Sequence, residues 1–74
     1  MIGTNVQRVR IARGLTQLEL ANRIGRWHTF VGQIEAGKRQ PSLETLMNLA
    51  TALDVSVEEL LRPDAVEIVE SVAE

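Results

Sequence analysis

Hydrogen-bonding and basic side chains are concentrated between residues 28 and 40 of this 74-residue chain. The set comprises His28, Thr29, Gln33, Lys38, Arg39 and Gln40. Imidazole, hydroxyl and amide groups donate and accept hydrogen bonds, and the two cations attract anions. This chemistry favours recognition of a polar, negatively charged partner.

Groups that could catalyse a reaction are scarce. The chain has one histidine, no cysteine, no tyrosine and no glycine-rich phosphate loop. Glu58 and Glu59 form an adjacent pair that we expect to face solvent, so general acid–base and nucleophilic chemistry lack their components. We therefore expect no enzyme. A single histidine without cysteine also predicts no metal site, and we expect no cofactor.

Capping residues and glycines predict five helices that would position these side chains. Three cap residues are followed three positions later by Gln or Glu, namely Thr4, Thr16 and Ser56, and Ser42 follows Pro41. Such pairs satisfy free backbone donors where a helix begins. Gly14, Gly25 and Gly37 can end helices in the left-handed conformation. The sequence predicts helices at about 5–13, 17–24, 28–36, 43–53 and 57–62, and no strand.

Apolar residues recur at spacings of three and four within the predicted helices, as in Val31 and Ile34 or in Leu46, Leu49 and Leu53. Helices this short do not persist alone, so their apolar stripes must share one core. We expect an all-α, compact five-helix domain over residues 1–62. Residues 63–74 form an acidic C-terminal segment, either a short amphipathic helix or a frayed tail.

Charge is divided unequally along the chain. Residues 1–43 carry seven Arg or Lys and two acids, whereas residues 44–74 carry one Arg and eight acids. The net charge of −2 therefore hides a basic half and an acidic half. A fold that separates the halves would present one face to a polyanion such as DNA, although ordinary solvated charge would give the same counts.

No stretch of the sequence predicts association with a membrane. The chain lacks an apolar run of about 18 residues and does not begin with a basic region followed by an apolar stretch, so we expect neither a membrane span nor a signal peptide. The absence of cysteine suits a reducing cytosol, and we expect a cytoplasmic protein. One small domain leaves no room for a separate sensor, so no small-molecule effector is evident.

Residues 17–36 predict two helices that cross at a glycine turn. Ala21 is small where the helices must approach, Gly25 can form the turn, and Val31 and Ile34 would bury the second helix. At about 100° per residue, the opposite side of that helix carries Thr29, Gly32, Gln33 and Ala36, with His28 beside them. Such a narrow polar face could enter a DNA major groove, where a glutamine amide can pair with adenine.

In chain order, these motifs resemble the Cro and phage-repressor type of helix-turn-helix regulators, often called XRE-like. The resemblance covers about residues 4–62 and is carried by Gly14-Leu15-Thr16-Gln17, Glu19-Leu20-Ala21, Gly25, Thr29-Phe30-Val31-Gly32, Ile34-Glu35, Gly37-Lys38-Arg39, Pro41-Ser42-Leu43-Glu44-Thr45-Leu46, Leu49-Ala50 and Leu53-Asp54-Val55-Ser56-Val57. It implies a lambda-repressor-like fold, sequence-specific binding to a double-stranded DNA operator and usually a homodimer.

The resemblance also implies roles for individual residues. The family's base-reading positions are His28, Thr29 and Gln33, and the outward face of the helix adds Gly32. The family's DNA phosphate-binding positions are Gln17, Lys38, Arg39 and Gln40. We also expect Arg26 and Trp27, next to the turn glycine, to be phosphate-binding. Arg10 and Glu35 match a pair that ties the first helix to the end of the third in many members of the family.

Arg26 and Trp27 depart from the family pattern, which places an apolar residue and then a capping residue after the turn glycine. Trp27 therefore either packs over the turn or lies on the sugar-phosphate backbone. Leu18 is polar in most relatives and could belong to a surface patch or be a scattered exposed leucine.

Two functions are compatible with these observations. The first is a sequence-specific DNA-binding transcriptional regulator, a dimeric repressor that reads a near-palindromic operator through its third helix. The alternative is a protein-interaction or antitoxin-like module whose main partner is another protein. We expect a homodimer surface that involves the fifth helix and the segment after it.

Overall fold

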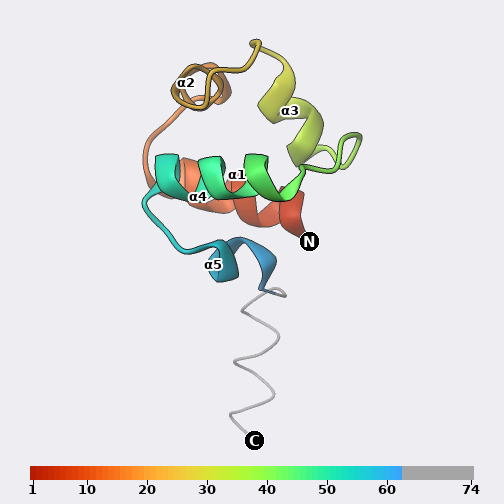
Figure 1. The fold of residues 1–74 in the computed structure, drawn as a ribbon. Helices are drawn as coiled ribbons and strands as arrows, with labels where there is room; N and C mark the ends of the chain where they lie inside the picture. Colours follow the sequence, from red (N-terminus) through yellow and green to blue (C-terminus); the bar gives the residue numbers. More distant parts are fainter. Residues whose placement is uncertain (63–74) are drawn as a thin grey trace, which may run out of the picture.

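The computed structural model describes residues 1–62, and these residues form five helices. The helices are α1 (Ile2–Ala12), α2 (Gln17–Arg23), α3 (Phe30–Glu35), α4 (Leu43–Leu53) and α5 (Val57–Leu61) (Figure 1). No strand occurs within residues 1–62, so the all-α, five-helix prediction is confirmed. The predicted acidic segment at 63–74 lies outside the described residues.

Two helices lie on one side of a central pair of helices, and one helix lies on the other side. In Figure 1, α1 and α4 cross the middle of the molecule, α2 and α3 lie above them, and α5 lies below. Helix α1 contacts both α3 and α5, and α2 contacts both α3 and α4. The longest helices thus form a platform, in which α1 contacts α3 and α4 contacts α2.

Aliphatic side chains from all five helices meet in one core. Those with no exposed surface are Val6, Leu20, Ala21, Val31, Leu49, Leu53 and Leu60. Every helix contributes to this set, as the apolar spacing predicted. Burial of such side chains is the main stabilising contribution, because none of these helices is long enough to persist alone.

Three of the four predicted N-cap residues are confirmed, and one is wrong. Thr16 and Glu19 form a reciprocal capping box, with N–O distances of 3.0 and 2.8 Å. The Ser42 and Ser56 hydroxyls accept from backbone N–H groups three residues later. Thr4 caps nothing, because α1 begins at Ile2 and Met1 occupies its N-cap position. The early start places Gly3 against the end of α3, a tertiary contact that local capping signals do not register.

The third helix begins two residues after its predicted start at about residue 28. Helix α3 begins at Phe30, and His28 and Thr29 lie in the turn before it. Thr29 stands at the N-cap position but makes no side-chain capping bond. The Phe30 N–H donates to the Trp27 carbonyl over 3.0 Å, so the chain makes one turn there before the helix begins.

Two polar side chains link segments far apart in the sequence, and no sequence pattern predicted either link. Asn5, fully buried in α1, donates from Nδ2 to the carbonyl oxygens of Leu60 and Arg62. Arg13 donates from Nε to the Leu53 carbonyl at the end of α4, over 2.7 Å. These bonds satisfy carbonyl groups that helix ends leave without partners.

Within residues 1–62, no helix combines the length and apolar character that crossing a bilayer requires.

Candidate nucleic-acid interface

Helices α2 and α3 form a helix-turn-helix around Gly25. Gly25 has φ of +73°, a conformation that side chains disfavour, and the next N–H, that of Arg26, donates to the Ala21 carbonyl over 2.9 Å. Ala21, Val31 and Ile34 are buried between the helices and the platform. The aliphatic side of α3 therefore faces the core, and its other side faces outward.

The four expected base-reading residues lie along this outer side, in two structural settings. His28 and Thr29 are exposed in the turn before α3, whereas Gly32 and Gln33 are partly buried on α3 itself. A Cβ at Gly32 would lie 3.3 Å from the Gln17 amide oxygen. Glycine at this position thus leaves room for Gln17 beside α3.

The structure brings Arg10 and Glu35 together in a partly buried ion pair. Arg10 donates from Nε and Nη2 to the two Glu35 carboxylate oxygens over 2.6 and 3.1 Å, and from Nη1 to the Leu15 carbonyl over 2.8 Å. Gln17 Nε2 also donates to Glu35, over 2.9 Å. The Glu35 side chain is only 3% exposed, so its negative charge is paired inside the protein and away from the outer side of α3.

Aromatic and arginine side chains form a cluster beside the start of α3. This aromatic–arginine cluster consists of Arg26, Trp27, Phe30 and Arg39. The two rings meet edge to face, with centroids 4.8 Å apart. Phe30 is buried, but Trp27 remains 48% exposed. The indole therefore packs against Phe30 and keeps about half of its surface open.

Within this cluster, Arg39 contacts Gln33, which the sequence did not predict. Arg39 Nε donates to Gln33 Oε1 over 2.9 Å, and the Arg39 guanidinium lies over the rings of Trp27 and Phe30, 5.2 and 5.3 Å from their centroids. The spacing of six residues across a loop carries no periodic signal, so only the folded chain reveals the contact.

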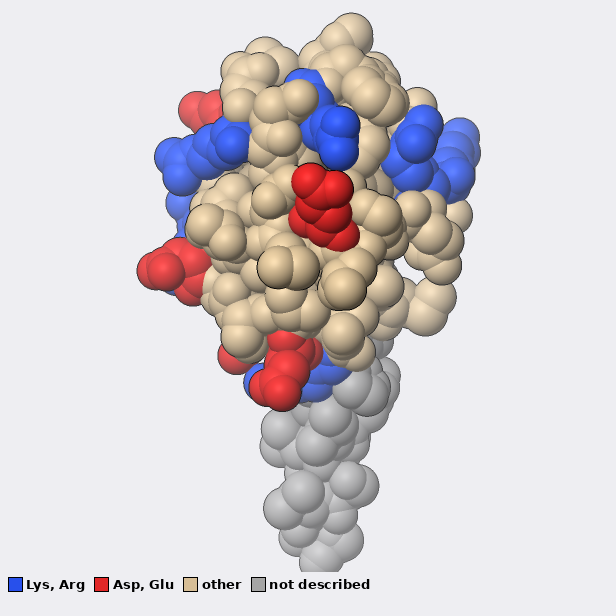
Figure 2. Space-filling model, in the orientation of Figure 1, with Lys and Arg blue, Asp and Glu red and all other residues tan. Residues whose placement is uncertain are grey.

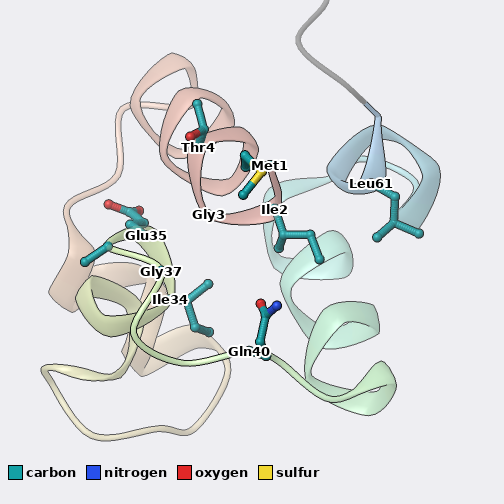
Figure 3. Close-up of a pocket in the computed structure, with 10 residues that line it drawn as sticks. Met1, Ile2, Gly3, Thr4, Ile34, Glu35, Gly37, Gln40 and Leu61 are labelled. Atoms are coloured by element: carbon teal, nitrogen blue, oxygen red, sulfur yellow. The ribbon is translucent and has the colours of Figure 1, made fainter.

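The loop after α3 carries the remaining expected phosphate-binding residues. Lys38, Arg39 and Gln40 are all exposed. Gln40 also lines a cavity of about 560 Å³ between the start of α1, the end of α3 and Leu61 of α5 (Figure 3). The loop thus borders the polar side of α3 with two cations.

Basic residues are unevenly spread on the surface shown in Figure 2. Most of the Lys and Arg surface lies in the upper half, over α2, α3 and the loop after α3, whereas acidic surface lies at the upper left, at the left side, at the centre and at the lower end near α5. In such an arrangement a polyanion is attracted to one end of the domain.

The chain is similar in sequence to known helix-turn-helix proteins. A family model described as helix-turn-helix matches residues 6–60. The chain is 41% identical over 63 residues to an uncharacterised HTH-type transcriptional regulator of Sinorhizobium fredii, covering 85% of this chain and 82% of that protein. Two matched regulators of Bacillus subtilis are longer, and the chain spans 56% and 57% of their lengths.

Solved structures show the same fold. The restriction-modification controller protein C.AhdI of Aeromonas hydrophila is 41% identical with a TM-score of 0.77, and the match covers 80% of this chain and 89% of that one. The master regulator for biofilm formation SinR, solved in complex with DNA, is 33% identical with a TM-score of 0.78. The match covers 84% of this chain and 100% of that one.

Proposed function

Because this chain belongs to the helix-turn-helix family of XRE-like transcriptional regulators, we propose that it is a dimeric repressor that reads a near-palindromic operator through α3. The observation that carries the proposal is the division of α3. Val31 and Ile34 bury one side, and the opposite side presents Gln33 next to two loop cations. A helix with this division can lie in a major groove while the cations follow the phosphates.

In this proposal the turn and the first part of α3 read base edges. His28 and Thr29 extend from the turn into the groove, Gln33 follows from the helix, and Gly32 permits close approach of the backbone. The N-terminal end of a recognition helix is the part that contacts bases in this architecture, so the turn position of the first two residues is compatible with base reading.

The phosphate contacts lie around this base-reading strip. They are assigned to Gln17, Arg26, Trp27, Lys38, Arg39 and Gln40. Gln17 is held beside α3 by Glu35, and an amide has a second N–H with which to reach a phosphate. The open half of the Trp27 ring would lie against the sugar-phosphate backbone.

A dimer would place two copies of α3 in successive major grooves about 34 Å apart. The proposed contact surface includes Leu61, a large apolar residue that is 52% exposed on α5. Leu61 borders the cavity that also reaches the end of α3 (Figure 3), and pairing there would leave Gln33 and the start of α3 uncovered.

The proposal is tested by selecting bound sequences from random double-stranded DNA and measuring affinity by fluorescence anisotropy at several salt concentrations. Each of Arg26, Lys38 and Arg39 that neutralises a phosphate contributes a slope of about −0.9 in a plot of log K against log salt. We expect affinity to fall more than tenfold between about 50 and 200 mM salt. Binding that ignores salt, or a pool without an enriched sequence, would refute the proposal.

Gln33 is expected to be needed for specificity rather than for general attraction. Gln33→Ala should lower affinity for the selected operator about tenfold, because a lost base contact costs about 1–3 kcal/mol, and should change affinity for random DNA little. Gln7→Ala, at an exposed glutamine of α1, serves as the matched control and should leave both affinities unchanged. Equal losses on both DNAs in the Gln33 variant would remove Gln33 from base reading.

A further inference from the structure

Arg39 is fixed in place by contacts on two sides. Its guanidinium lies over the rings of Trp27 and Phe30, and Phe30 is itself anchored in the core. A cation over aromatic faces is attracted by the negative potential of the rings. The long arginine side chain is therefore held in one arrangement before any partner binds.

The same arginine is tied to Gln33 by both side chain and backbone. Its Nε donates to the Gln33 side-chain oxygen over 2.9 Å. The backbone N–H groups of Lys38 and Arg39 also donate to the Gln33 carbonyl, over 2.9 and 3.2 Å. The loop after α3 is thus closed onto the residue that the proposed function places in the groove.

The chemistry of arginine determines which way the Gln33 amide is turned. A guanidinium has only donors, so the atom that faces Arg39 must be the amide oxygen. An unrestrained glutamine can turn its amide over, exchanging oxygen and nitrogen, and so can offer either a donor or an acceptor to a base. Here the oxygen is engaged by Arg39, and Nε2 remains to donate.

We propose that Arg39 is a positioning residue that sets which base Gln33 reads; the inference rests on the proposed function. With its oxygen held by Arg39, Gln33 donates from Nε2 to an acceptor on a base edge. Purine N7, guanine O6 and thymine O4 are such acceptors in the major groove, whereas cytosine presents an amino donor. Gln33 therefore selects a base with an acceptor over cytosine, and this preference depends on Arg39.

The test measures base preference as a ratio of affinities within each variant, so that a general loss of charge cancels. The operator is first selected with the full chain, and Gln33→Ala locates the position that Gln33 reads. Affinity is then measured for the four base pairs and for a 7-deazapurine at that position. For the unmodified protein, we expect the selected base to be preferred about tenfold over cytosine, and adenine to be preferred over 7-deazaadenine.

Arg39→Ala should abolish this preference at the Gln33 position while other positions keep theirs, and adding Gln33→Ala should change the ratio no further. Lys38→Ala is the matched control, because its side chain makes no hydrogen bond to Gln33; it should lower affinity on all sequences alike. A melting curve for each variant shows that it is folded.

Two results would overturn the inference while leaving the proposed function intact. One is an Arg39→Ala protein that still discriminates against cytosine at that position, and the other is an unmodified protein that binds cytosine there as well as the selected base. A chain that enriches no sequence at all would instead refute the proposed function, and the inference with it.

Discussion

Replacing Arg10 with methionine is expected to lower the free energy of unfolding by about 3–5 kcal/mol, because it leaves the carboxylate of Glu35 without its cationic partner at a side chain that is only 3% exposed. A domain of this size has a total stability on the order of 5–10 kcal/mol. The variant should therefore lose a large part of its stability. The measurement is urea unfolding followed by circular dichroism.

The exposed ion pair between Arg62 and Glu59 provides the matched control. Its side chains are 47% and 42% exposed, and its N–O distance is 3.3 Å. Glu59→Gln should cost less than about 1 kcal/mol, because water screens exposed charges. Replacing both Arg10 and Glu35 with methionine should cost less than Arg10→Met alone, since no unpaired charge remains buried. A small loss in Arg10→Met would show that Glu35 finds another partner or water.

Gly3→Ala is expected to destabilise the protein by about 2 kcal/mol. A Cβ at Gly3 would overlap the carbonyl oxygen of Ile34 and lie 2.9 Å from that of Glu35. Both neighbours are backbone atoms, so α1 and α3 must move apart. Overpacking of this kind lowers the free energy of unfolding by up to about 3 kcal/mol. Alanine regains about 1 kcal/mol of helix propensity over glycine, which does not offset the overlap.

The control for this prediction is Thr4→Ala, at an exposed position next to Gly3 on the same helix. It should change stability by no more than about 0.5 kcal/mol. Because Gly3 touches the end of α3, Gly3→Ala should also weaken operator binding at temperatures where the protein remains folded. A Gly3→Ala protein as stable as the unmodified chain would show that the two helices are not in the close contact described.

The local features of the fold could be predicted from the sequence. The apolar stripe of each helix, the caps at Thr16, Ser42 and Ser56, and the turn at Gly25 all depend on residues a few positions apart. Val31 and Ile34 were predicted to bury α3, and both are buried. The family was identified from the resemblance of these motifs to the Cro and phage-repressor regulators, and it is shown by the comparisons.

Contacts between distant residues were decided only by the tertiary structure. The start of α1 at Ile2, with Gly3 against α3, contradicted a good local cap at Thr4. The Asn5 bonds to the end of α5 and the Arg39 bond to Gln33 also gave no signal in the sequence.

The physical reason is that helix caps and apolar stripes repeat at spacings fixed by backbone geometry, whereas a bond across a loop or between helices depends on how the whole chain packs. Sequence alone therefore identified the polar and basic residues on and next to α3. The packed structure decided that Arg39 bonds the Gln33 side chain.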